Sequence, residues 1–366
     1  MTDDNVAAPY RNTNPTPVIR GLRTARELLY RAGGVSGINP VVSRTAWRDN
    51  RLLILCYHGI SIADEHEWSE LYVPQEHLER RVKWLRANQF NILPLDEAIH
   101  AMYARRLPPR AVTLTFDDGS CDFALKAMPV LAAYRVPATV YLTTYHVTSQ
   151  LPIFGPMASY LLWKAPGRTY TVPGTSLRRT APPRDDREAR SRLQLEMADR
   201  ARLTGLSAQA KHSWLVTLAA ELDLDFDALL AKRLFHLMSP AELASLDRDL
   251  VDLQLHTHRH TNPDDAVQFR REIDDNRGAM QDYVRDKPLR HFCYPSGVYT
   301  ADQVRWLADA GVVSATTCNP GLAGPGHSPW ILPRLVDTQD VTDAKFAAWA
   351  HGIGHIIRRF IGGKVG

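Results

Sequence analysis

The chain has 366 residues, 45% of them hydrophobic, which excludes an intrinsically disordered protein and allows one large barrel or two ordinary domains. Its 44 basic and 40 acidic side chains leave a formal charge of +4, an excess too small to indicate a nucleic-acid partner. The four cysteines form no CxxC pair, so they predict reduced thiols rather than a zinc ribbon or a disulfide framework.

Residues 1–50 are predicted to form an N-terminal extension. Residues 1–17 are polar and contain prolines, which is typical of a disordered segment, and residues 18–31 have the apolar spacing of an amphipathic helix. The chain does not begin with an apolar leader, and no run of about 18 apolar residues occurs in it. We therefore expect a cytoplasmic protein.

From residue 51 to about residue 340, apolar runs typical of buried strands alternate with helical patterns. The expected strands include "LLILCYH", "AVTLTFDD", "PATVYLTT", "LVDLQLHTH", "LRHFCYP" and "VVSATTC". This alternation indicates an α/β protein with a mostly parallel sheet, either open or closed into a barrel.

Two further segments depart from this alternation. Residues 146–246 contain proline-rich and arginine-rich stretches followed by helical patterns, which predicts a largely helical insertion that forms a lid or a rim. Residues 341–366 are expected to form a basic amphipathic helix. Each amphipathic terminus is expected either to pack on the protein surface or to make a peripheral contact with the inner membrane.

The segment "TLTFDDGS" is an apolar strand that ends in Asp117 and Asp118. In parallel α/β proteins the carboxyl ends of the strands face the ligand-binding crevice, so acids at this position point to function. Adjacent carboxylates repel each other, and one acid that binds a cation beside a second that acts as a free base would relieve this repulsion. The alternative is a simple turn in which one aspartate caps the following helix.

The segment "LQLHTHRHTNP" places His256, His258 and His260 at alternate positions after another apolar run. A continued strand would point all three to one face, whereas a helical turn after His256 would bring only His256 and His260 together. The following "TNPDD" favours the helical turn. Two neutral imidazoles and a carboxylate suit zinc or another first-row divalent ion. The alternative is that these histidines are packed core residues or solvated loop residues.

The segments "TFDDG", "HTHRH" and "FCYPSG", in this order, resemble the successive motifs of the polysaccharide deacetylases, the NodB-homology group or carbohydrate esterase family 4. The segments "ILCYHGI" and "LPRLVD" resemble the flanking segments of one branch of that family. The resemblance implies a distorted (β/α) barrel of the NodB-homology type. It also implies a metal-dependent hydrolase that removes an acetyl group from an N-acetylated sugar in a glycan, glycolipid or glycoconjugate precursor.

The resemblance also assigns roles by position. Asp117 would be the catalytic base for attack by a metal-bound water, and Asp118, His256 and His260 would bind a divalent metal, for which we expect zinc. His258 has no role in the family motif.

The chain departs from the family pattern at two places. The position of an arginine that often orients the base is taken by Cys293, and no late histidine that would act as the general acid is recognisable. We hypothesise that Arg334 supplies the missing cation and that His58 is the substitute acid; the alternative for His58 is a hydrogen bond within the wall of the site. With Arg334, Tyr294 and Pro295 are predicted to bind substrate, because a rigid Tyr-Pro turn exposes a ring to a sugar, although a purely structural turn is the alternative.

Two other functions stay open. The same metal and base would hydrolyse a non-sugar amide, and a member without the arginine and the late histidine would bind a glycan without catalysis.

Overall fold

The apolar runs of the sequence form one parallel sheet in the computed structural model of the protein, which describes residues 27–31, 38–284 and 287–361. Its central strands are buried along their whole length, as expected when helices cover a parallel sheet. The strands of this sheet are β1 (Leu53–Tyr57), β4 (Asn91–Ile92), β5 (Ala111–Phe116), β6 (Ala138–Leu142), β9 (Val251–Leu255), β10 (His291–Cys293), β11 (Ser314–Thr316) and β12 (Leu335–Val336).

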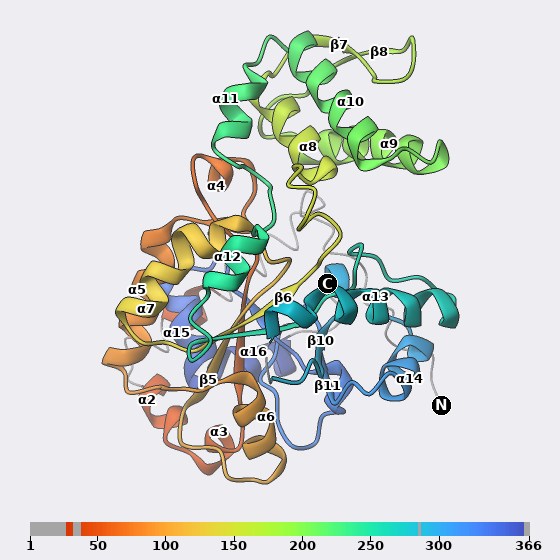
Figure 1. Cartoon of the computed structure of the whole chain (residues 1–366). Coiled ribbons are helices and arrows are strands. Elements are labelled where there is room, and N and C mark those ends of the chain that lie inside the picture. The colour runs from red at the N-terminus through yellow and green to blue at the C-terminus, as the bar shows by residue number, and fades with distance from the viewer. Residues whose placement is uncertain (1–26, 32–37, 285–286, 362–366) are drawn as a thin grey trace.

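The sheet is curled and lies among the helices (Figure 1). Its strand order is β11-β10-β9-β6-β5-β1-β12, with β4 beside β5, and all of these pairs are parallel. Leu332 forms a parallel bridge with Thr316 of β11, and Leu335 of β12 pairs with Leu55 of β1. The chain around β12 therefore lies between β1 and β11, which gives a curled, distorted (β/α) barrel and confirms the predicted fold class.

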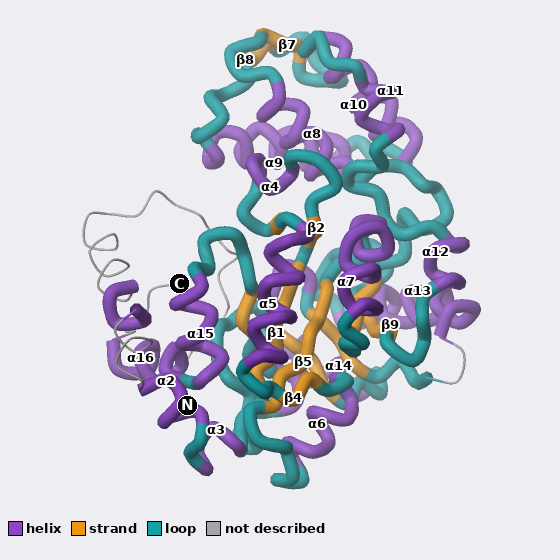
Figure 2. Tube along the Cα trace, turned by 90° about the vertical axis from the view of Figure 1, so that its left-hand side faces the viewer, coloured by secondary structure: helices purple, strands orange, loops and turns teal. Residues whose placement is uncertain are grey.

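Amphipathic helices connect the strands and cover the outside of the sheet (Figure 2). In α5, for example, Leu78, Val82 and Leu85 are spaced for one helical face, and all three pack into the main hydrophobic cluster. The helices that connect or follow the strands are α5 (Gln75–Ala87), α6 (Leu95–Tyr103), α7 (Met128–Ala133), α12 (Pro240–Ser245), α13 (Ala266–Val284) and α14 (Ala301–Asp309).

The segment between β6 and β9 is largely helical, as predicted, and stands at one end of the barrel (Figure 1). It has a hydrophobic cluster of its own. It also contacts the chain after β1, where the ring of Trp68 lies 5.1 Å from that of Phe235 and its Nε1 donates to Ser159 Oγ at 3.2 Å. Besides α12, its elements are α8 (Phe154–Lys164), β7 (Thr169–Thr171), β8 (Arg178–Thr180), α9 (Arg187–Leu203), α10 (Ala208–Glu221) and α11 (Phe226–Ala231). The chain after β1 forms β2 (Gly59–Ile60), α4 (Glu65–Trp68) and β3 (Tyr72–Val73).

The terminal segments only partly follow the expectations. The predicted helix over residues 18–31 lies mostly outside the described residues, of which 27–31 are helical. The C-terminal segment forms α15 (Asp343–His351) and α16 (Ile353–Ile361) rather than one helix, because Gly352 between them has a φ of 104°. Phe346 and Trp349 bury α15 in the main cluster. The remaining short helices at the N-terminal side are α2 (Ile38–Ser43) and α3 (Ala46–Asp49).

Within the described part of the chain, every helix is too short or too polar to cross a lipid bilayer.

His351, at the end of α15, provides a test of the fold by pH. It is only 6% exposed and packs against the rings of Trp84 and Phe90. Burial, followed by the charges of Arg48 and Arg110, lowers the pKa of His351 from 6.5 to about 4. Between these values the unfolded chain binds a proton that the folded protein does not bind. Stability is therefore expected to fall by up to about 3 kcal/mol as the pH decreases from 6.5 to 4.

Urea denaturation of the wild type and of His351→Gln at pH 7, 5.5 and 4.5 checks this expectation. The variant should lose less stability than the wild type over this range. His100→Gln, which replaces an exposed histidine of α6, is the control. Equal pH dependence of the wild type and His351→Gln would contradict the expectation.

Candidate functional site

Three strands end in polar side chains at the same edge of the barrel. His58 follows β1, Asp117 and Asp118 follow β5, and His256 follows β9. The parallel register pairs Tyr57 with Phe116, so β1 and β5 end at the same height. Because carboxyl ends of parallel strands share one edge, the topology gathers these side chains.

Asp118, His256 and His260 form a compact cluster there. Asp118 Oδ1 lies 3.1 Å from His256 Nε2 and 3.2 Å from His260 Nε2. The three side chains offer ligand atoms within 4.8 Å of one another. His256 is buried, whereas the His260 side chain is 39% exposed, so the cluster opens toward solvent on the His260 side.

The hydrogen bonds of His256 show that this cluster fits a cation. Its Nδ1 lies 2.8 Å from the carbonyl oxygen of Cys293, which can only accept, so Nδ1 carries the proton. In the neutral ring, Nε2 then directs a lone pair at Asp118 Oδ1, which is favourable only with a proton or a cation between them. Burial lowers the pKa of His256, but the hydrogen bond to Asp118 and the negative charges of Asp117 and Asp118 together outweigh burial and raise it. The donor set of two imidazoles and one carboxylate matches zinc.

The route by which the two histidines converge differs from the expected one. The predicted helical turn after His256 is wrong, because Thr257 and His260 have φ values of 60° and 55° and the chain bends instead. Thr257 Oγ1 accepts from the backbone N–H of Thr261 at 3.1 Å, and α13 begins only at Ala266. A bend with two left-handed residues thus places both outer histidines beside Asp118.

His258 lies outside this cluster. Its Nδ1 is 2.7 Å from Thr144 Oγ1, and its ring packs edge-on against Tyr145 with centroids 5.6 Å apart.

Asp117 forms a buried ion pair with Arg334. The guanidinium donates to both carboxylate oxygens at 2.7 Å, and both side chains are almost fully buried. Burial alone would raise the pKa of Asp117, but the charge and hydrogen bonds of Arg334, with smaller contributions from His58 and His256, together outweigh burial and hold that pKa well below its usual range. Asp117 is therefore ionised at neutral pH and can accept a proton. Complete burial removes Arg334 from contact with a substrate, so its predicted place among the substrate-binding residues is wrong.

Three cysteines surround this ion pair. The Sγ atoms of Cys56 and Cys293 lie 3.5 and 3.4 Å from Asp117 Oδ2, and Cys318 Sγ lies 3.7 Å from a guanidinium nitrogen of Arg334. All four cysteines of the chain are free thiols. Their wide spacing in the sequence contains no signal for this gathering, which only the closed barrel produces.

His58 lies at the wall of the site. Its Nε2 is 3.8 Å from Asp117 Oδ2, too far for a hydrogen bond, and its side chain is 19% exposed. Burial lowers the pKa of His58 despite the attraction of Asp117, so the ring is neutral near pH 7. A neutral ring must gain a proton before it acts as an acid.

Tyr294 and Pro295 do not face a substrate. Tyr294 is fully buried, its hydroxyl donates to the carbonyl oxygen of Trp330 at 3.1 Å, and its ring packs 5.0 Å from that of Tyr299. Pro295 is buried as well. The predicted exposed aromatic ring is wrong, because the side chain after β10 points into the main hydrophobic cluster, and the turn is structural.

The end of the helical insertion borders the site. Gly119, directly after Asp118, has a φ of 79°, and a Cβ there would lie 2.2 Å from Leu142 Cδ1, so any other residue would need a strained backbone and a shift of Leu142. The Gly119 carbonyl accepts from Met238 N at 3.0 Å, and Cys121 N donates to the carbonyl of His236 at 2.8 Å. The segment that closes the insertion therefore lies beside the two aspartates.

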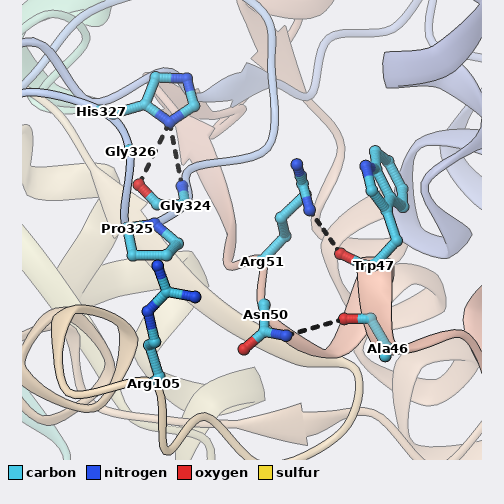
Figure 3. A pocket seen from close by; sticks show the side chains of 9 residues that line it. All are labelled: Ala46, Trp47, Asn50, Arg51, Arg105, Gly324, Pro325, Gly326 and His327. Carbon is cyan, nitrogen blue, oxygen red and sulfur yellow. Dashed lines mark hydrogen bonds between the residues drawn. The ribbon is translucent and has the colours of Figure 1, made fainter.

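A pocket at the opposite end of the barrel is separate from this site. Its volume is about 410 Å³, and Figure 3 shows Arg51 and Arg105 among its lining side chains, together with Trp47 and His327. Arg51 precedes β1 and Arg105 precedes β5, so the pocket lies at the amino ends of these strands. None of the predicted site residues lines it.

Comparisons with known proteins agree with this geometry. The sequence profile described as polysaccharide deacetylase matches residues 104–197 and 207–315, more than half of the chain. A poly-beta-1,6-N-acetyl-D-glucosamine N-deacetylase of Staphylococcus aureus is 29% identical over 112 residues, which are 28% of this chain and 39% of that protein. A putative polysaccharide deacetylase of Bacillus subtilis, YxkH, is 36% identical over 93 residues, which are 25% of this chain and 32% of that protein. The matched region thus spans well under half of each relative.

Solved structures share the fold. The Streptococcus pyogenes deacetylase PplD, solved in complex with acetate, superposes with a TM-score of 0.50 at 16% identity, over 81% of this chain and 96% of that one. A polysaccharide deacetylase from Bacillus cereus, BC0361, also gives 0.50, at 15% identity, over 82% of this chain and 69% of that one. With the profile match and the motifs at the barrel edge, these findings show that the chain belongs to the polysaccharide deacetylase family.

Proposed function

We propose that the protein hydrolyses the acetamide of N-acetylated sugars in a glycan or glycoconjugate, with a divalent metal, zinc in our expectation, at Asp118, His256 and His260. The observation that carries the proposal is that a proton acceptor and a set of metal-binding side chains lie next to each other at one edge of the barrel. An ionised carboxylate, Asp117, directly precedes a cluster whose donors fit a cation. The Staphylococcus aureus relatives, named for the deacetylation of poly-beta-1,6-N-acetyl-D-glucosamine, support an N-acetylglucosamine polymer as the substrate class.

Each residue of the site is assigned a separate part in the reaction. A divalent cation held there would lower the pKa of a bound water and polarise the acetamide carbonyl. Asp117 accepts the proton of the attacking water, and the two bonds from Arg334 hold its carboxylate in one orientation. The C–N bond of the amide then breaks, and the leaving sugar amine takes up a proton. We propose that His58, a partly exposed side chain 3.8 Å from Asp117, receives the proton that Asp117 has accepted and delivers it to the amine, so that both residues return to their starting protonation states.

Release of free acetate from β-1,6-linked and β-1,4-linked N-acetylglucosamine oligomers tests the function. We expect acetate from at least one series, a rate about 10²-fold lower after treatment with a chelator, and recovery when zinc is restored. An acetylated lysine peptide serves as the non-sugar amide control.

Two results would contradict the proposal. Acetate release that is unaffected by complete metal removal would exclude the metal centre. Hydrolysis of the peptide but of neither oligomer series would exclude a sugar substrate.

A further inference from the structure

The middle histidine of "HTHRH" is left without a role by the proposed function. His258 lies two residues from each of the proposed ligands His256 and His260, yet its ring is directed to Thr144. Its surroundings explain why.

The main chain of His258 is held from two sides. Its carbonyl oxygen accepts from Thr143 Oγ1 at 3.0 Å, from Thr144 N at 3.2 Å and from Tyr145 N at 2.9 Å. These three residues directly follow β6. Its own N–H donates to the carbonyl of Glu272 in α13 at 3.1 Å. Residue 258 is therefore fixed between the end of β6 and α13.

Hydrogen bonds through Thr144 and Asn276 also link the side chain of His258 to the backbone of His256. Asn276 of α13 accepts from the backbone N–H of His256 at 3.0 Å, so the oxygen of its amide must face that N–H. Its Nδ2 then donates to Thr144 Oγ1 at 3.0 Å and to the carbonyl of Leu142 at 3.0 Å. Because Thr144 Oγ1 already accepts there, its hydroxyl proton is free to donate to His258 Nδ1 at 2.7 Å.

We name Thr144, His258 and Asn276 the loop clasp. Asn276 is fully buried and Thr144 nearly so, which protects these bonds from competition with water. The clasp spans a bend whose residues Thr257 and His260 have left-handed φ values, a conformation that costs free energy for residues other than glycine.

We propose that the loop clasp preorganises His256 and His260 for the metal, and that His258 is a positioning residue rather than a ligand. The proposal rests on the metal centre of the proposed function. Without the clasp the bend relaxes away from its left-handed conformation, and the two Nε2 atoms no longer meet at Asp118. Metal binding must then restore the bend, which weakens the affinity.

Zinc affinity, measured by competition with a chromophoric chelator, tests the clasp. Thr144→Val removes the hydroxyl at constant shape, and His258→Leu removes the ring nitrogen. Each is expected to raise the zinc dissociation constant by about 10-fold or more. The double variant should lose no more than the stronger single variant, because both break the same chain of bonds.

A conservative variant of His258 shows whether the hydrogen bond to Thr144 or the size of the side chain matters for zinc binding. His258→Asn places an amide oxygen close to the position of Nδ1, so it can still accept from Thr144, and it is expected to keep zinc affinity within about threefold of the wild type. Thr139→Val is the matched control for Thr144→Val. Thr139 is buried in β6, and its hydroxyl has no hydrogen-bond partner in the described part of the chain. The zinc affinity of Thr139→Val should therefore equal that of the wild type.

The outcomes separate the clasp from the metal centre itself. If Thr144→Val and His258→Leu lower only the thermal midpoint and bind zinc like the wild type, the clasp is merely structural and the inference is wrong. If His256→Ala binds zinc as tightly as the wild type, the metal centre is wrong, and the role of the clasp falls with it. If His256→Ala loses tight zinc binding while both clasp variants keep the affinity of the wild type, the metal centre stands and only the proposed role of the clasp is wrong.

Discussion

The Asp117→Asn variant is expected to release acetate about 10³-fold more slowly than the wild type, because an amide cannot accept the proton of the attacking water. Zinc affinity should stay close to that of the wild type, since Asp118, His256 and His260 are unchanged. The variant should also be less stable, because Arg334 keeps its buried charge without a partner. Steady-state kinetics and chelator competition on the same preparation distinguish loss of the base from loss of the metal.

A matched control removes another paired carboxylate. Asp96 contacts Arg290 at 2.6 and 2.7 Å and His291 at 3.0 Å, at the amino end of β10 and so away from the site. Asp96→Asn should destabilise the fold without lowering the turnover of the folded enzyme. Wild-type acetate release by Asp117→Asn would remove Asp117 from the role of base.

The Arg334→Met variant is expected to lower the free energy of unfolding by about 3–5 kcal/mol at pH 7, because it leaves the Asp117 carboxylate buried without its cation. The pKa of Asp117 determines how this loss of stability changes with pH. In the wild type Arg334 depresses this pKa, so the pair stabilises the fold above the unfolded value of 3.8 and is lost only in acid. In the variant burial raises the pKa instead, and the deficit should shrink as the pH falls and the carboxylate becomes neutral.

Urea denaturation at pH 7 and pH 5 measures both effects. The Asp117→Asn/Arg334→Met double variant should recover part of the lost stability, because neither buried charge remains. Arg271→Met replaces an exposed arginine of α13 and should change the free energy of unfolding by less than about 0.5 kcal/mol. A deficit in Arg334→Met that matches this control would show that the buried pair contributes nothing.

The relation between Arg334 and Cys293 accounts for one departure from the family pattern. Cys293 takes the motif position at which the family often has an arginine, and its thiol lies 3.1 Å from the guanidinium of Arg334. Arg334 reaches the carboxylate from the segment before β12, and the small thiols fill the space around it. The cation is thus supplied from another part of the sheet.

Much of the site was predictable from residue order alone. Runs such as "AVTLTF" and "VDLQL" are apolar because both faces of their strands are buried, and this property belongs to each strand separately. Polar residues directly after such a run must lie at the carboxyl edge of a parallel sheet. Asp117, Asp118, His256 and His260 could therefore be assigned to one edge before any tertiary contact was known.

Two predictions are wrong because the local sequence pattern is compatible with two different tertiary structures. The "TNPDD" segment fits a helical turn after His256, but hydrogen bonds from the end of β6 and from α13 draw the chain into a left-handed bend. Tyr294 after β10 fits an exposed ring, but the closure of the barrel directs it into the core. The preference of a turn residue is weak compared with a set of buried hydrogen bonds or a packed ring.

The sequence by itself determined the strands, the edge at which the acids and histidines gather, and the chemistry of a carboxylate with two imidazoles. Only the tertiary structure decided which cation holds Asp117, which thiols surround it, and how His258 is used. The Asp117–Arg334 pair joins residues 217 positions apart, and the clasp joins Thr144 to residues more than 110 positions away. Such contacts depend on how strands pair and how the sheet closes, and the periodicity of a single segment contains no information about either.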